Sequence, residues 1–292
     1  MASLIFGARL SNADTTLFRA WGSAVSTALG QMLTRVTQTG EINWATVNAP
    51  VAPNTFQGFE VYRLNDSLQS TAPLFFKFEY GSAPSSAQLP AIKLTIGKSV
   101  DGSGSVSNVL QSAINVLSGN GSATASSNCY VSNGDGSGFV FSLQPDVPNT
   151  IGGFCCVERS RNSQGQPTAN ALVLSFQTYG TNTTHTNRFI AYDLETTLAA
   201  DGSGLFACPL PLSTDIGVTN GTVAQFFPVA CIAPNGATWR SRMLLGAARQ
   251  NASLGQPAES ILYGQNYIGL GSGVQRADQR GGTYATYMIW WN

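Results

Sequence analysis

Two short stretches, LFFKFEY at residues 74–80 and AIKLTI at residues 91–96, decide the fold class that this sequence predicts. In both, large apolar side chains occupy every second position: Leu74, Phe76, Phe78 and Tyr80 in the first, and Ile92, Leu94 and Ile96 in the second. Side chains two residues apart lie on the same face of a β-strand. Each stretch is therefore predicted to be a strand with one buried face.

The same signal recurs along the chain. Further predicted strands are residues 59–64, 139–143, 172–179, 189–194, 223–232, 261–268 and 284–291. Asn-Gly pairs, which suit the positive φ angles of tight hairpin turns, stand at residues 120–121, 133–134, 220–221 and 235–236. Short strands with such turns predict a mainly β protein, an antiparallel β-sandwich or barrel-like domain. Residues 106–117 fit a short helix about as well as a strand.

One segment near the start has a helical period instead. Between residues 15 and 36 the apolar side chains recur three and four positions apart: Leu17, Trp21, Val25, Leu29, Met32, Leu33 and Val36. Asn12 or Asp14 can cap the start of this amphipathic helix. Gly22 and Gly30 weaken it in isolation, so it needs a partner surface in its own domain or in a neighbouring subunit.

The change of period divides the chain into two predicted parts. Residues 1–45 are expected to form an N-terminal helical arm, and residues 46–292 a β-rich domain. A break near residues 100–135 would divide that domain into two subdomains. Residues 45–55 contain two prolines and no period, which predicts an extended arm or linker.

Composition and charge exclude several classes of function. Charged residues make up 10% of the chain and the formal net charge is zero, so no overall field attracts nucleic acid or an anionic membrane. No run of about 18 apolar residues is present, and the first ten residues lack the basic segment of a signal peptide. We therefore expect neither nucleic acid nor a membrane as partner. The five cysteines are expected to be buried free thiols.

The motifs of common enzyme and metal sites are absent from the sequence. His185 is the one histidine and lies in a polar stretch, residues 180–187, that is expected to be an exposed loop. The tetrapeptide Asp-Gly-Ser-Gly occurs at residues 101–104, 135–138 and 201–204, but each copy offers too few oxygen ligands for calcium and is predicted to be a turn. We assign no catalytic, cofactor-binding or metal-ligating residue, expect no cofactor, and do not expect an enzyme.

Sugar chemistry is the alternative that sequence excludes least. Paired carboxylates for glycoside cleavage converge from different strands; the candidates are Glu60, Asp66, Glu79 and Glu158, each expected on an outward strand face or in a turn. Aromatic side chains could also stack on sugar rings, although in strands they more often pack in the core. These candidates are Tyr62, Tyr80, Tyr179, Tyr192, Tyr263, Tyr267 and Trp239.

The kind of basic residue indicates protein contacts. Three of the fifteen basic residues are lysine and the rest are arginine, a bias typical of stable interfaces. The strongly apolar ending, residues 287–292, is expected to be a closing core strand or a contact with another subunit. The candidate interface residues are Trp21, Arg240, Arg242, Trp290 and Trp291.

Residues 18–31 (FRAWGSAVSTALGQ) and 40–83 contain a moderately specific pattern: Trp44, Gly58, Phe59, Glu60, Tyr62, Asn65, Asp66 and the stretch 75–81. With this pattern, about the first third of the chain resembles virion structural proteins encoded among the structural genes of tailed bacteriophages. The ending, residues 284–292, is similar more loosely. The resemblance carries no catalytic motif and implies no active-site residue.

The resemblance implies a structural subunit of a bacteriophage particle, in the tail or attachment apparatus, that packs with its own copies as a homo-oligomer and with other virion proteins. The implied location is the virion, assembled in the bacterial host cytoplasm, which suits unpaired cysteines. The alternatives are a carbohydrate-binding host-attachment module with a surface glycan as partner, a decoration protein of the capsid surface, and, less favoured, a polysaccharide depolymerase.

Chelation tests the turn assignment of the Asp-Gly-Ser-Gly copies. Because each copy lacks the ligand set of a calcium loop, we expect excess chelator to leave the Tm of the full chain unchanged in a thermal scan. Re-addition of calcium is the control. A drop of several degrees that calcium restores would contradict the turn assignment.

Overall fold

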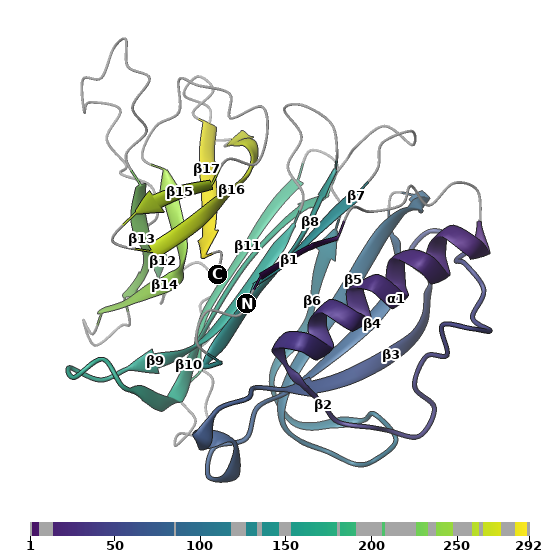
Figure 1. The fold of residues 1–292 in the computed structure, drawn as a ribbon, viewed down its shortest axis with the longest axis horizontal. Coiled ribbons are helices and arrows are strands. Elements are labelled where there is room, and N and C mark those ends of the chain that lie inside the picture. Colours follow the sequence, from purple (N-terminus) through teal and green to yellow (C-terminus); the bar gives the residue numbers. More distant parts are fainter. Residues whose placement is uncertain are drawn as a thin grey trace.

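A computed structural model describes residues 2–5, 14–84, 86–117, 127–132, 136–145, 153–179, 182–190, 206–207, 226–232, 238–247, 259–262, 265–275 and 284–290. These residues form one α-helix, a short 3-10 helix and the strands of three sheets (Figure 1). Every pairing between the described strands is antiparallel. The predicted class, mainly β and sandwich-like with an N-terminal helix, is confirmed.

The three sheets follow one another along the chain, apart from one N-terminal strand. The first sheet, in spatial order, contains β2 (Thr34–Arg35), β3 (Phe56–Arg63), β4 (Phe75–Ala83), β5 (Ser86–Val100) and β6 (Val106–Leu117). The central sheet contains β1 (Ala2–Ile5), β7 (Ser127–Ser132), β8 (Gly138–Pro145), β9 (Phe154–Arg161), β10 (Pro167–Tyr179) and β11 (Asn182–Ile190). The C-terminal sheet contains β12 (Phe206–Ala207), β13 (Phe226–Ile232), β14 (Thr238–Ala247), β17 (Tyr284–Trp290), β16 (Gln265–Gln275) and β15 (Glu259–Leu262).

The strands that alternation predicted are present, with differences at some boundaries. The two deciding stretches lie in β4 and β5, which pair with Phe78 opposite Leu94. Residues 106–117 form strand β6, and residues 261–268 are divided between β15 and β16. Of the predicted strand 189–194, residues 189–190 belong to β11, and residues 191–194 lie outside the described residues. The four Asn-Gly pairs lie outside the described residues.

Helix α1 (Thr15–Met32) begins at a capping aspartate and ends earlier than its apolar period predicts. Asp14 Oδ1 accepts a hydrogen bond from the Leu17 amide at 3.0 Å, so Asp14 is the cap. After Met32 the chain becomes extended because Thr34 and Arg35 pair with β3 as strand β2. Gly22 lowers the intrinsic stability of the helix, but it also leaves room for Trp44. A Cβ atom at this position would lie 2.0 Å from the Trp44 ring.

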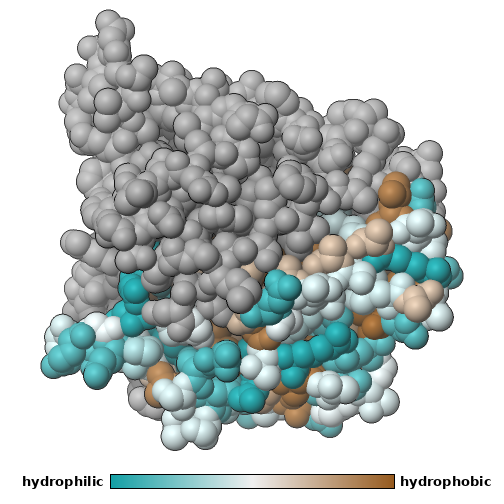
Figure 2. Space-filling view, in the orientation of Figure 1, coloured by the Kyte–Doolittle hydropathy of each residue, from teal (hydrophilic) through white to brown (hydrophobic). Residues whose placement is uncertain are grey.

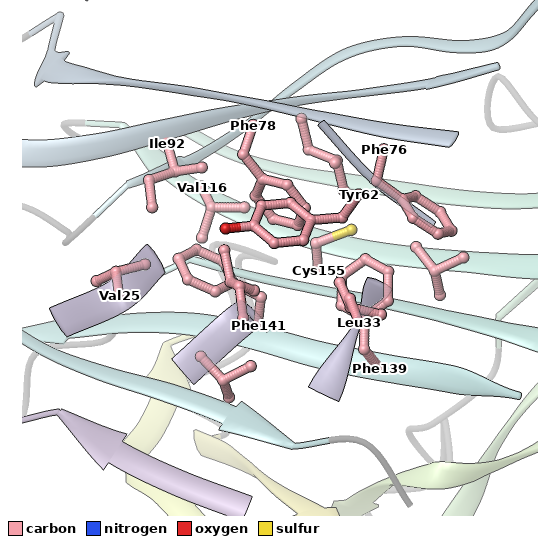
Figure 3. Packing of buried hydrophobic residues seen from close by; sticks show 14 of the residues in the cluster. Val25, Leu33, Tyr62, Phe76, Phe78, Ile92, Val116, Phe139, Phe141 and Cys155 are labelled. Atoms are coloured by element: carbon pink, nitrogen blue, oxygen red, sulfur yellow. The ribbon is translucent and has the colours of Figure 1, made fainter. Parts of the chain in front are cut away.

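Helix α1 packs on its own chain, one of the two alternatives that its sequence allows. Trp21 packs edge-on against Tyr80 of β4, with ring centroids 6.3 Å apart. On the same face of β4, Phe76 and Phe78 contact Phe139 of the central sheet, at 4.9 and 5.9 Å between ring centroids (Figure 3). The helix and the central sheet therefore lie side by side on one face of the first sheet, and together they complete a sandwich.

The predicted division at residue 45 does not correspond to a division of the core. Side chains from Phe18 in the helix to Val173 in β10 belong to one buried cluster. The irregular segment 45–55 is bonded to the helix, with Arg19 Nε donating to the Val47 carbonyl at 2.7 Å and the Ala49 amide to Thr15 Oγ1 at 3.2 Å. The expected break near residues 100–135 coincides with the change from β6 to β7, but the two sheets share this core.

Residues 138–143, 154–160 and 171–175 of the central sheet are buried on both of its faces. One face belongs to the cluster shared with the first sheet, while on the other face alternate residues are also buried: Val140, Cys156, Leu172 and Leu174. Strand β14 of the C-terminal sheet lies against β8 and β9 on this second side. The described elements therefore form three successive layers (Figure 1).

Replacement of the helix tryptophan tests whether α1 is part of the fold. Trp21 is 2% exposed, so Trp21→Ala should leave a cavity and reduce the free energy of unfolding by about 3–5 kcal/mol. Guanidinium titration followed by circular dichroism measures the change. Ser23→Ala, on the exposed side of the same helix, is the matched control and should change stability by less than about 0.5 kcal/mol. A loss below about 1 kcal/mol for Trp21→Ala would contradict this packing.

Candidate functional site

The most concentrated set of polar contacts in the described part of the chain surrounds Glu60 on β3. The Glu60 carboxylate is fully buried and accepts from five side chains: Ser26 Oγ at 2.7 Å, Trp44 Nε1 at 3.2 Å, Tyr62 OH at 2.8 Å, Tyr80 OH at 2.6 Å, and Arg35 Nη2 at 3.1 Å as an ion pair. We call Glu60 with these five donors the Glu60 cluster. Its donors come from α1, β2, β3, β4 and the segment after β2.

The Glu60 cluster corrects the expectation that Glu60 faces outward. A buried carboxylate is tolerated only when it is paired and hydrogen-bonded, and the five donors meet that condition for both oxygens. Burial, with the negative charge of Glu60 beside it, raises the pKa of the Tyr62 phenol above its ordinary value. Tyr62 therefore keeps its proton and donates a hydrogen bond to the carboxylate.

The accessibility of the Glu60 cluster decides what it can do chemically. Glu60, Tyr62 and Tyr80 each have no exposed surface. A general acid or base must come within hydrogen-bond reach of its substrate, and a stacking tyrosine must present its ring face. In this structure the cluster therefore holds elements together, and neither the carboxylate chemistry nor the sugar stacking considered for these residues applies to them.

A second buried charge connects the central sheet to the first. Arg159 on β9 is 1% exposed; its guanidinium donates to Asp66 Oδ2 at 2.9 Å, to the Ala169 carbonyl at 3.0 Å and to the Ala72 carbonyl at 2.7 Å. Asp66 precedes the 3-10 helix η1 (Ser67–Ser70) between β3 and β4. The planar guanidinium thus joins this connection to β9 and β10.

Glu158, the residue before Arg159, points to the other side of the central sheet. It is 5% exposed, which corrects its expected outward position. Its Oε2 accepts from the Arg242 amide of β14 at 3.1 Å, whereas its Oε1 is buried without a hydrogen-bond partner. Burial is the largest influence on the Glu158 carboxyl and raises its pKa to about 7. Hydrogen bonds from Ser241 and Arg242 act in the opposite direction but are weaker.

The remaining acidic candidate and the described Asp-Gly-Ser-Gly copy are surface features. Glu79 on the outer face of β4 pairs with Lys93 at 3.3 Å. Asp101 Oδ1 accepts from the amides of Ser103 and Ser105 at 2.8 and 3.0 Å, a closed turn as predicted. Hydrogen bonds from Ser103 lower the pKa of Asp101 to about 2. Residues 135 and 201–204 of the other copies lie outside the described residues.

His185 is in a strand, not in the polar loop expected for it. It belongs to β11, where its backbone lies opposite Phe176 of β10. The run of threonine and asparagine around it suggested a loop, but threonine also favours strands. Cys155 and Cys156 are buried and form no disulfide, as predicted, and burial raises the pKa of the Cys155 thiol. The other three cysteines lie outside the described side chains.

Of the five predicted interface residues, Trp21 and Arg242 have side chains within the described part of the structure. Trp21, expected at an interface, is instead a core residue. Arg240 and Arg242 lie on β14, and Arg242 is half-buried where that strand meets β9. Trp290 of β17 lies opposite Tyr267 of β16. Strand β17 pairs with β14 on one side and β16 on the other, so residues 284–290 form an inner strand of this sheet. Trp291 lies outside the described residues.

The remaining stacking candidates belong either to strands or to segments outside the described residues. Tyr179, Tyr267 and Trp239 belong to strands β10, β16 and β14, whereas Tyr192 and Tyr263 lie outside the described residues.

Comparison with protein-family models, curated proteins and solved structures finds no match. Within the described ranges, no helix is long and apolar enough to cross a membrane, and no three potential metal ligands of the His, Cys, Asp or Glu type are grouped.

Neutralising the buried glutamate tests the structural role of the Glu60 cluster. Glu60→Gln keeps the shape but places an amide nitrogen among donors, so we expect a loss of about 3–5 kcal/mol in the free energy of unfolding. Urea titration at neutral pH measures it. Glu79→Gln breaks a partly exposed pair with Lys93 on the outer face of β4 and should cost at most about 1 kcal/mol. Equal small losses for both variants would show that the buried contacts do not hold the fold.

Proposed function

We propose that this chain is a structural subunit of a bacteriophage particle, in the tail or attachment apparatus, and that it works by packing against its own copies and other virion proteins. The observation that carries the proposal is the position of the residues that resemble virion structural proteins. Trp44, Glu60 and Tyr62 belong to the Glu60 cluster, and Asp66 is the partner of Arg159. The residues that carry the resemblance are therefore ones that hold helices, strands and connections of the fold together.

The glycine of the resembling pattern fits the same interpretation. A Cβ atom at Gly58 would lie 2.8 Å from the Ile42 side chain, so this position allows the segment after β2 to approach β3 closely. The stretch 75–81 supplies the inner-face aromatics Phe76, Phe78 and Tyr80. Packing residues of this kind favour a protein that keeps a fixed shape over one that presents a reactive group.

The surface supports a packing role as well. In Figure 2 hydrophilic and near-neutral residues cover most of the described part of the visible face, with hydrophobic residues scattered among them. A formal net charge of zero and 10% charged residues leave little electrostatic repulsion between copies. When copies of one chain associate, closed symmetric assembly is the ordinary arrangement.

Quantitative mass spectrometry of purified particles tests the proposal. Phage particles from a host that carries the gene should contain this chain in several copies, in a fixed ratio to the other structural proteins, because a structural subunit occupies symmetric positions. The matched control is the unassembled lysate fraction. A chain that is abundant in the lysate and absent from the particles would contradict the proposal.

The rival functions have different readouts. A glycan-binding module would retain a host polysaccharide on a glycan array, and a depolymerase would release reducing sugar from it. Light scattering of the isolated chain addresses self-assembly. If the isolated chain is a monomer at micromolar concentration, it does not self-assemble without virion partners. The packing role would then rest on contacts with other virion proteins alone.

A further inference from the structure

The contact between the central and C-terminal sheets contains a buried carboxyl group. Glu158 lies on the face of β9 that points away from the first sheet, and its Oε2 accepts from the backbone amide of Arg242 on β14 at 3.1 Å. Met243, the next residue on β14, is 3% exposed. The carboxyl group therefore lies inside the contact, where it joins two sheets through the backbone of one of them.

The surroundings of this carboxyl favour its neutral form. Oε1 is buried without a hydrogen-bond partner, and an unpartnered buried oxygen costs more when it is charged. The groups that oppose this cost are Ser241 and Arg242 from β14 and Arg161 from β9. Arg161 is itself bonded to the Gly165 carbonyl and to Ser137 Oγ.

The other strands that flank Glu158 bring no charge to it. The paired position on β8 is Gly138 and the paired position on β10 is Leu172. Arg159, the sequence neighbour, donates to Asp66 in the direction of the first sheet. The attraction of Arg242 and Arg161 offsets only part of the cost of burial, so ionisation of Glu158 leaves a buried negative charge in a contact between two sheets.

We propose that the contact between the central and C-terminal sheets is a pH-sensitive joint, which is closed while the Glu158 carboxyl is protonated and loosens when its proton passes to water. The joint is independent of the function proposed above, because it rests on contacts within one chain. Its closed form retains the hydrogen bond from the Arg242 amide to Glu158.

The direction of the pH effect follows from the shift of this group. Burial raises the pKa of Glu158 from an ordinary 4.5 to about 7. An acid that holds its proton more tightly in the closed state stabilises that state fully below the ordinary pKa, and the stabilisation is lost as pH rises through the raised pKa. The joint should therefore be tight at pH 5.5 and looser at pH 8.5.

Hydrogen exchange of the full chain, read by mass spectrometry, tests the joint at pH values from 5.5 to 8.5, with exchange times scaled for the intrinsic rate. We expect protection of residues 238–247 in β14 to fall by about tenfold or more relative to residues 75–83 in β4. In Glu158→Gln, which stays neutral, this relative loss should disappear. Glu79→Gln, on the outer face of β4, is the control and should behave as the wild type.

A second variant makes the test independent of whether Glu158→Gln folds. Ser241→Ala removes a hydrogen bond that lowers the pKa of Glu158, so the midpoint of the protection change should move to higher pH. Constant relative protection of residues 238–247 in the wild type would overturn the proposal. So would an unchanged pH dependence in Glu158→Gln, or an unchanged midpoint in Ser241→Ala.

Discussion

The buried carboxylate of Glu60 is the constraint on which the N-terminal half of the structure depends. One charge without solvent exposure needs donors for both oxygens, and these come from a helix, three strands and a connecting segment. The requirement therefore specifies how α1 lies on the first sheet and where the segment after β2 must pass. Hydrophobic burial alone has no such directional demand, because apolar contacts tolerate many arrangements of similar area.

The fold could be predicted from residues whose environment differs between the two faces of a strand. Alternation identified β4 and β5 because one face is core and the other carries Lys77, Glu79 and Lys93. Strand β9, FCCVERSR, shows no such pattern because nearly all of its residues are buried. The Glu60 cluster was missed for another reason: Ser26, Arg35 and Trp44 are far apart in sequence, and no local period brings them together. The resemblance pattern contained Trp44, Glu60 and Tyr62 but not their contacts.

The central sheet connects the layers by different kinds of interaction on its two faces. On one face Phe139 and Phe141 contact aromatic side chains of the first sheet, and Arg159 adds two hydrogen bonds to the connection between β3 and β4, at Asp66 and Ala72. On the other face Glu158 contributes a hydrogen bond to β14 beside an unpartnered oxygen. Consecutive residues of one strand thus contribute differently to the two contacts: Arg159 is a buried cation paired with Asp66, whereas Glu158 is a buried acid with a raised pKa. The two layer contacts therefore respond differently to pH.

The strand order of the C-terminal sheet has a consequence for synthesis on the ribosome. Strand β17 lies between β14 and β16, although it is the last of the three to be translated. Until residue 290 has left the exit tunnel, β14 and β16 each lack one of their two neighbours, whereas β3, β4 and β5 can pair in the order in which they emerge. Nascent chains should therefore contain a complete first sheet while β14 and β16 still have unpaired edges. Unpaired strand edges are the kind of surface that chaperones protect from aggregation.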